Sequence, residues 1–243
     1  MKPGKAAGPD GVPMDVIKTL DEIHLEGLTE ILNDWWLNKK VPEEMTRAKV
    51  VLLFKKGPTA DLGNYRPISL LNSIYKVMAA ILKARLEQEV EADLHSTQFG
   101  FRKGKGTADA IQIIRRIIDK GESTNTKTIL TLLDWEKAFD KVTHGALAMA
   151  LRRMGVSKPL REMIMALFEN PEFNVEQHGV TSGWKKQSTG IRQGCPLSPY
   201  LCVVIMTVLF RDVKSRHEVN MDDGRIRGIC IWMRSSMLTV QSA

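Results

Sequence analysis

The chain has 243 residues, a formal net charge of +7 at pH 7 and a sequence pI of about 9.3. Hydrophobic residues make up 43% and charged residues 26%, a globular composition that excludes an intrinsically disordered chain. The cysteines Cys195, Cys202 and Cys230 form no C-x-x-C pair, which argues against a zinc site or a disulfide framework and favours a reducing compartment. The basic balance favours a polyanionic partner such as nucleic acid, although charge alone does not separate such a protein from an ordinary basic one.

The N-terminus also bears on where the protein acts. Residues 1–10 are rich in Lys, Gly and Pro and lack the apolar run of a signal peptide. The longest apolar stretch, Leu201 to Phe210, is too short to span a bilayer. We therefore expect an intracellular protein, nuclear or cytoplasmic, that is not secreted and has no membrane partner.

Hydrophobic periodicity and turn residues predict the elements of the first half of the chain. In order, they are a loop over residues 1–13, a helix from Asp15 to about Asn38, a strand over Ala48 to Phe54, a polar turn region over Lys55 to Asn64, and a helix from 69 to about 90 with Ser69 as its N-cap.

The second half continues with helices and strands in mixed order. It predicts a helix from Thr107 or Asp109 to Lys120 with Gly121 as its stop, a strand over Thr128 to Leu133 that ends in Asp134, helices over about 145–154 and 158–169, a strand over Phe173 to Gln177, a helix from Ser198 to about Arg216, and a last strand over Ile226 to Trp232. There is no regular βαβ repetition, so we expect an α+β fold and not a doubly wound one.

Asp134 is the first residue with a chemical interest, because a buried strand delivers it to the surface of a sheet. A carboxylate held by rigid backbone is how proteins usually present an oxygen ligand to a hard cation such as Mg²⁺. The alternative is that Asp134 caps a helical turn that follows it.

The segment GIRQGCPLSP, residues 190–199, must form a shaped loop because of its glycines and prolines. It carries Arg192 and Gln193 and leads into a helix N-terminus, where backbone N–H groups suit a phosphate or a nucleic-acid strand. A purely structural turn explains the same residues.

Cations gather at two other places. Lys55, Lys56 and Arg66 flank a turn between two expected strands, where they suit a triphosphate or form a solvated hairpin tip. The segment QFGFRKGK, residues 98–105, alternates Phe with cations, which is typical of single-strand binding but equally compatible with buried rings and solvated charges.

Taken together and in order, these stretches resemble the consecutive blocks of reverse transcriptases. The blocks are GPDGVP, NYRPISLLNSIYK, QFGFRKGKGTADAI, LLDWEKAFDKV and GIRQGCPLSP. They are most similar to those of LINE-type (non-LTR) retrotransposons, with group II intron enzymes next. The resemblance extends from about Gly4 to Phe210.

The resemblance implies a role for several residues. Asp134 matches the catalytic metal ligand of the family, and the carbonyl of Trp135 matches a backbone ligand. Phe139 matches the ring under the incoming sugar, which leaves no room for a 2′-hydroxyl. The remaining matches are nucleotide-binding Lys55, Arg66, Gln193 and Gly194, and template-binding Arg102 and Arg192. Because Lys56 stands where the family often has Pro, the register at Lys55 is open by one residue.

The implied reaction is RNA-directed DNA synthesis, in which deoxynucleotides are added to a primer 3′-hydroxyl. The implied partners are an RNA template, a DNA primer and deoxynucleoside triphosphates, with Mg²⁺ as cofactor. The implied fold has fingers and a palm with an antiparallel sheet and packed helices, and we expect Asp134 at the end of a central strand of that sheet. We expect an N-terminal extension and first fingers helix over residues 1–47, fingers over 48–122 and a partial palm over 123–232.

The C-terminal part departs from the family. No aromatic-x-Asp-Asp hairpin follows GIRQG, and the adjacent Asp222 and Asp223 lie in the polar segment VNMDDGRIRG. Residues 233–243 match nothing in the family and are expected to be an aberrant tail, with no thumb. We therefore expect a truncated reverse transcriptase that is inactive as printed.

Two other functions stay open from the sequence. The first is a nucleic-acid-binding remnant without catalysis, which would have the same basic surface. The second is an intron-maturase-like RNA-binding protein, although RPISLLN and KAFDKV are more similar to the LINE type.

Overall fold

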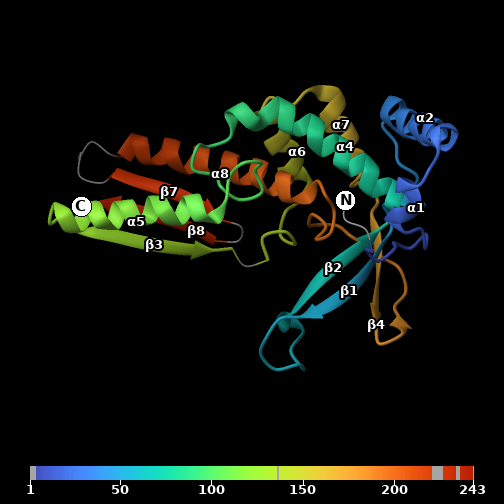
Figure 1. The fold of residues 1–243 in the computed structure, drawn as a ribbon, viewed down its shortest axis with the longest axis horizontal. Helices are drawn as coiled ribbons and strands as arrows, with labels where there is room; N and C mark the ends of the chain where they lie inside the picture. Colours follow the sequence, from blue (N-terminus) through green and yellow to red (C-terminus); the bar gives the residue numbers. More distant parts are fainter. Residues whose placement is uncertain (1–3, 136, 221–226, 234–235, 243) are drawn as a thin grey trace. The chain divides into compact units, whose positions relative to one another are not determined.

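The computed structural model describes residues 4–135, 137–220, 227–233 and 236–242; for residues 131, 133, 134 and those after 213 it describes the backbone alone. The chain divides into two compact units, and both combine helices with a β-sheet (Figure 1). Unit 1 comprises Met1–Val90 and Phe139–Ser198, and unit 2 comprises Glu91–Ala138 and Pro199–Ala243. The mixed order of elements confirms the α+β class. Asp222 and Asp223 lie outside the described residues.

Unit 1 contains a sheet of strand order β2-β1-β4-β5, with β6 also paired to β4. Strand β1 is antiparallel to β2 and parallel to β4. The bounds are α1 Met14–Lys18, α2 Glu22–Asn38, α3 Glu43–Thr46, β1 Ala48–Phe54, β2 Tyr65–Leu71, α4 Ser73–Val90, α6 His144–Arg153, α7 Lys158–Ala166, β4 Glu172–Gln177, β5 Val180–Thr181 and β6 Lys185–Lys186, with a 3₁₀ turn at Leu62–Asn64.

The core of unit 1 is built where α4 and α6 pack on α7. Apolar positions recur along each of these helices at helical spacing, and the ones that face inward lose their contact with water. Fully buried side chains include Leu71, Tyr75, Met78, Leu82, Leu86, Leu147, Leu151, Leu160, Met163, Ile164 and Leu167.

Unit 2 contains a three-stranded antiparallel sheet of order β3-β8-β7. Helix α5 lies along this sheet (Figure 1) and contributes to a cluster with Phe99 and Leu130. The bounds are a 3₁₀ turn at Glu91–Asp93, α5 Thr107–Ser123, β3 Thr128–Asp134, α8 Ser198–Asn220, β7 Arg227–Met233 and β8 Ser236–Ser242. Residues 233–243, which match no family block, thus include a strand.

The position of β3 corrects one expectation. Asp134 was expected to end a central strand of a palm-like sheet, and it does end an antiparallel strand. Within the described sheet, however, β3 is an edge strand that pairs only with β8. A strand's own sequence shows its faces but not how many neighbours it has, so this could not be foreseen.

The helix expected from residue 69 begins at Ser73. Residues 65–71 form β2 instead, because they pair in full register with β1, and Ser69 lies opposite Val50. Ser69 is therefore a strand residue and not an N-cap. A long-range strand pairing outweighs the local capping signal here.

Two further bounds differ from expectation. The helix expected from Asp15 to Asn38 is broken, and α2 begins after Asp21, whose carboxylate accepts from the His24 amide at 3.0 Å. Gly121 does not stop its helix, which continues to Ser123. A Cβ at Gly121 would lie 2.4 Å from Thr128 Oγ1, so the glycine permits close packing of α5 on β3.

Candidate nucleotide and nucleic-acid site

The β1–β2 hairpin of unit 1 places two of the expected nucleotide-binding cations on one face. Arg66 lies opposite Leu53, and opposite residues of an antiparallel pair project to the same face. Lys55 follows Leu53 by two positions, and its amide still donates to the Asn64 carbonyl at 2.8 Å. Because side chains alternate along a strand, Lys55 shares the face of Arg66 and Lys56 does not. The backbone register therefore favours Lys55 over Lys56.

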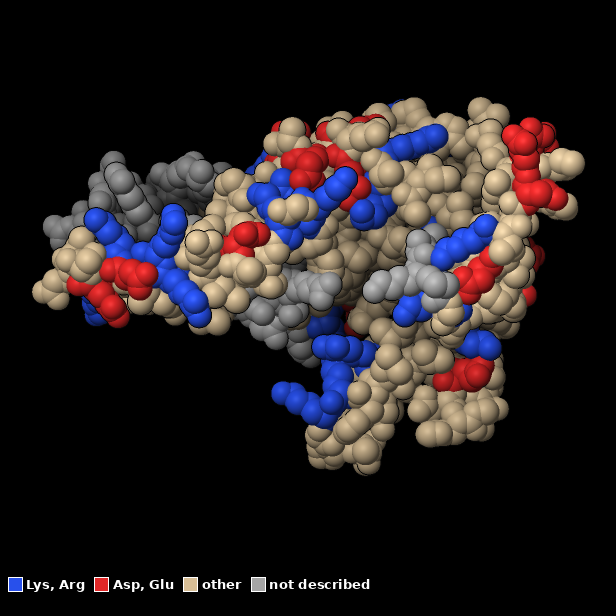
Figure 2. Space-filling view, in the orientation of Figure 1, with Lys and Arg blue, Asp and Glu red and all other residues tan. Residues whose placement is uncertain are grey.

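Both cations are exposed. Within the described residues, neither the Lys55 ammonium nor the Arg66 guanidinium has a hydrogen-bond or ion-pair partner. Figure 2 shows Lys and Arg gathered where the hairpin approaches its turn. These charges are available to an anionic ligand.

The turn of this hairpin is held by its own polar groups. Asn64 Nδ2 donates to the Pro58 carbonyl at 2.9 Å, and the Tyr65 hydroxyl donates to the Thr59 carbonyl at 2.9 Å. The rings of Phe54 and Tyr65 meet edge to face at 5.4 Å. These contacts, all within residues 54–65, shape the hairpin end.

The GIRQG loop, residues 190–194, lies directly on the free edge of β2. The Ser69 amide donates to the Gln193 carbonyl at 2.7 Å. A Cβ on Gly194 would lie 2.3 Å from the Ser69 carbonyl oxygen, and Gly194 has a φ of +128°. Only glycine combines this close approach with this backbone conformation. The sequence signal was the glycine itself, but Ser69 as its partner could not be read from the sequence.

The same loop is tied to the KAFDKV block, residues 137–142. The Ile191 amide donates to the Phe139 carbonyl at 2.8 Å, and the Gly190 amide donates to the Val142 carbonyl. Gln193 Nε2 lies 3.4 Å from Asp140 Oδ1. Unit 1 therefore brings together Phe139, Gln193 and Gly194, which the sequence had assigned to one nucleotide pocket.

The GPDGVP block joins this assembly at the end of β2. A Cβ on Gly8 would lie 2.4 Å from the Leu71 backbone, and the Asp10 amide donates to Asn72 Oδ1 at 3.1 Å. Burial lowers the pKa of the Lys76 ammonium below its ordinary value, and nearby Asp10 opposes that shift. Asn72 was missed as a site-organising residue; its place in the NYRPISLLNSIYK block was a signal, but the sequence predicted a helix there and not the end of a strand.

Arg192 lies inside unit 1. The residue is buried, with 3% of its surface exposed. Its Nε donates to Gln187 Oε1 at 3.1 Å and its Nη2 donates to the Glu172 carbonyl at 3.3 Å. The expected role of Arg192 in template binding stays a prediction.

Arg102, in unit 2, is similarly enclosed, with a side chain 7% exposed. It pairs with Glu91 at 2.7 Å and donates to the His95 carbonyl at 2.9 Å. The buried Tyr200 hydroxyl donates to the same Glu91 carboxylate at 2.7 Å. Arg102 therefore ties the QFGFRKGK segment to neighbouring elements of unit 2, and a template contact by Arg102 stays a prediction.

Asp134 is the last residue of β3, and Trp135 after it is 38% exposed. The first helix that follows, α6, is capped by Thr143, whose side chain accepts from the Ala146 amide at 3.1 Å. Among the described residues, no three His, Cys, Asp or Glu side chains lie close enough together to hold a metal ion. The metal role of Asp134 and Trp135 stays a prediction.

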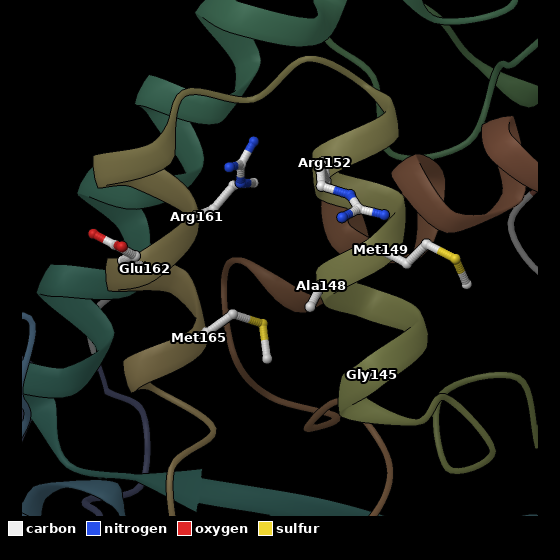
Figure 3. A pocket seen from close by; sticks show the side chains of 7 residues that line it. All are labelled: Gly145, Ala148, Met149, Arg152, Arg161, Glu162 and Met165. Carbon is white, nitrogen blue, oxygen red and sulfur yellow. The ribbon is translucent and has the colours of Figure 1, made fainter.

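A separate pocket of about 490 Å³ lies between α6 and α7. Figure 3 shows Ala148 and Met165 pointing between the helices, with Arg152 and Arg161 toward one end and Glu162 pointing away. None of the expected site residues lines it.

Among the described residues, none of the helices has the length and apolar content of a membrane span.

Residues 54–227 match the family model described as reverse transcriptase (RNA-dependent DNA polymerase), and the chain belongs to this family. This confirms the expectation from the sequence blocks.

The chain is 27% identical over 206 residues to the Pol polyprotein of the type-1 retrotransposable element R2 of Nasonia vitripennis, covering 85% of this chain and 20% of that protein. It is 28% identical to the RNA-directed DNA polymerase from mobile element jockey of Drosophila funebris, covering 83% and 22%. The chain thus spans about a fifth of the length of these curated relatives.

Solved structures agree on the fold. A telomerase from Candida tropicalis, truncated from its C-terminal domain, aligns with a TM-score of 0.56 at 14% identity over 88% of this chain and 48% of that one. A telomerase from Candida albicans in complex with a fragment of telomeric RNA aligns with a TM-score of 0.58 at 11% identity, over 87% and 40%. These neighbours confirm a reverse-transcriptase-like fold.

Proposed function

We propose that this chain is the nucleotide-handling part of an RNA-directed DNA polymerase of the non-LTR retrotransposon type. The observation that carries the proposal is the assembly of the KAFDKV and GIRQG blocks on strand β2, in a chain that belongs to the reverse transcriptase family. The reaction is the addition of deoxynucleotides to a primer 3′-hydroxyl on an RNA template.

The β1–β2 hairpin supplies the charge for the incoming nucleotide. Lys55 and Arg66 are exposed on one face, so both can approach a triphosphate without first breaking an ion pair within the described structure. The planar Arg66 guanidinium can hold two phosphate oxygens, and Lys55 acts as a point charge.

The pocket for the sugar and base lies at the loop. Phe139 is half-buried, and its carbonyl accepts from the Ile191 amide in the loop that carries Gln193 and Gly194. Its ring is the group proposed to exclude a 2′-hydroxyl. The Gly194 backbone can come close to a ligand because no side chain shields it.

Reverse transcriptases as a family use a divalent metal. For this chain we propose Mg²⁺ at the Asp134 carboxylate and the Trp135 carbonyl, which are hard oxygen donors at a strand end and fit such an ion chemically. When bound, the metal would stabilise charge on the transferring phosphates. Asp134 would hold the metal from the end of strand β3.

An RNA template is the partner expected of the family, and the DNA primer and deoxynucleoside triphosphates are proposals for this chain. We place its action inside the cell, in the nucleus or cytoplasm, where these partners occur. The first test is a salt titration of binding to an RNA–DNA hybrid. Affinity should fall steeply with salt, because each neutralised phosphate releases counterions. Affinity that is flat from low to moderate salt would contradict nucleic-acid binding.

The polypeptide as printed is expected not to extend a primer. Only Asp134 is matched to a metal ligand, and the two-metal reaction needs further carboxylates to offset repulsion between the cations. Primer extension on an RNA template, with Mg²⁺ and then Mn²⁺, measures this. Template-dependent extension that disappears in Asp134→Ala would overturn the expectation, and its loss in Asp222→Ala as well would identify a second ligand. Binding without extension fits a remnant that grips nucleic acid.

A further inference from the structure

Four buried polar side-chain atoms of unit 1 have no hydrogen-bond partner within the described structure: Asn174 Oδ1 on β4, and Arg192 Nη1, the Tyr75 hydroxyl and Ser198 Oγ. The Arg192 guanidinium carbon lies 5.8 Å from the centre of the Tyr75 ring. Burial raises the pKa of the Tyr75 hydroxyl and of the Cys195 thiol above their ordinary values, so both neighbours stay neutral. Arg192 itself belongs to the GIRQG loop, so this cluster includes part of the loop.

Keeping a guanidinium in such a place is costly. Arginine cannot lose its proton in a protein, and a buried charge that lacks a paired anion is strongly disfavoured. The described partners of Arg192 are neutral: the Gln187 side-chain oxygen and the Glu172 carbonyl. The Glu172 carboxylate is engaged by Arg47 at 3.0 Å. Burial of Arg192 therefore lowers the stability of the fold, unless its hydrogen bonds fix a segment that the function needs.

The hydrogen bonds that Arg192 donates fix the GIRQG loop. Gln187 accepts from Arg192 and donates from Nε2 to the Thr189 carbonyl at 3.0 Å and the Gly190 carbonyl at 3.1 Å. Arg192 thus links β4, through the Glu172 carbonyl, to the Thr189 and Gly190 backbone, through Gln187. The next residues in the chain are the ones that lie on β2.

We propose that Arg192 is a positioning residue, an interior brace that sets Gln193 and Gly194 against strand β2, and not a cation that contacts the template. The assignment deepens the proposed function, since the loop it positions is part of the proposed nucleotide pocket. Arg192 acts through the Gln187 amide and the β4 backbone.

The Ser69 amide reports this position directly. Its donation to the Gln193 carbonyl shows that it points away from β1. Since amides alternate in direction along an antiparallel strand, those of Ile68 and Leu70 point toward β1. Hydrogen exchange at the Ser69 amide therefore reports the contact between the GIRQG loop and β2. Exchange at the Ile68 and Leu70 amides reports the pairing of β2 with β1.

The test is hydrogen exchange by NMR on the full chain without nucleic acid, for Arg192→Gln, Arg192→Lys and Gln187→Ala. Ser69 exchange should rise at least about tenfold in Arg192→Gln and Gln187→Ala, while Ile68 and Leu70 stay protected. Arg192→Lys should restore only part of the protection, because one ammonium cannot donate in two fixed directions. Arg66→Gln, an exposed arginine on the same strand, is the matched control and should leave Ser69 unchanged.

A second readout separates bracing from template contact. If Arg192 touched a template phosphate, Arg192→Gln would lower the salt slope of hybrid binding by about 0.9. The brace predicts an unchanged slope. Unchanged Ser69 exchange in Gln187→Ala overturns the proposal, even if Arg192→Gln fails to fold. Should the chain bind no nucleic acid at all, the proposed function fails while the exchange result still decides the role of Arg192.

Discussion

The β1–β2 hairpin and the GIRQG loop both carry cations in family blocks, yet the structure treats those cations in opposite ways. Lys55 and Arg66 are exposed, whereas Arg192 is 3% exposed and donates to protein oxygens. The same contrast holds in unit 2, where Arg102 is enclosed by Glu91 and backbone carbonyls. Cations in these blocks thus differ in exposure: those of the hairpin are accessible to a ligand, whereas Arg192 and Arg102 are held by protein acceptors.

The largest effect is expected at the loop. Gly194→Ala places a Cβ 2.3 Å from a backbone oxygen of β2 at a φ of +128°. Overpacking and backbone strain together should cost about 3 kcal/mol of unfolding free energy. Chemical denaturation measures it. Gly183→Ala is the control, because a Cβ there meets nothing within 4 Å. Equal stability of the two variants would show that the loop does not lie on β2.

The second effect is expected in unit 2. Arg102→Met removes a guanidinium that bonds Glu91 and the carbonyls of His95 and Gln98. Because the Glu91 side chain is 43% exposed, the full cost of a buried pair does not apply, and we expect about 2 kcal/mol. Thermal unfolding measures the loss. The neighbouring exposed Lys103→Met should unfold like the parent chain, and a loss of equal size there would contradict the bracing role.

A smaller effect is expected at the start of α7. Ser157 is the N-cap residue of α7, and a side chain of another helix holds it in place. The Ser157 amide and hydroxyl both donate to the Glu89 carboxylate of α4 at 2.7 Å. Glu89→Ala should cost about 1 kcal/mol, the usual value of a lost cap. Glu87→Ala, on the same helix, removes only a pair with Lys83 and serves as the comparison in the same denaturation experiment. Identical losses would show that the cap is not stabilising.

The smallest effect on folding is expected at the hairpin. Lys55→Ala and Arg66→Ala remove exposed side chains without described partners, so stability should stay within about 0.5 kcal/mol. Denaturation curves that coincide with the parent curve confirm it. If either variant lost more unfolding free energy than Arg102→Met, the exposed cations would stabilise the fold more than the buried one, which contradicts the comparison.

Local patterns in the sequence predicted much of the fold. The strand over Ala48–Phe54 and the strand that ends in Asp134 have the expected bounds, because apolar β-type runs bounded by polar turns are read from neighbouring residues alone. The helix expected from Ser69 was wrong at its start, since residues 65–71 are held by β1 from a distance in the chain. Strand pairing is a long-range property that a capping residue does not reveal.

The candidate site was predicted less completely. Gly194 and Phe139 could be singled out by resemblance, and the glycine has a physical reason in its approach to Ser69. The burial of Arg192 and Arg102 could not be predicted, because several of their acceptors are backbone carbonyls, which every residue carries. Gln187, the side-chain partner of Arg192, stood in no sequence pattern that marked it.

The central claim is that exposed hairpin cations hold the incoming nucleotide. Its most direct measurement is the affinity of a fluorescent deoxynucleoside triphosphate for the chain, with an RNA template, a DNA primer and Mg²⁺ present. The double variant Lys55→Ala/Arg66→Ala should bind at least about tenfold more weakly than the parent, because two charge-assisted contacts to phosphate are lost. Lys158→Ala, an exposed lysine of α7, should bind like the parent. Equal affinity for all three chains would contradict the claim.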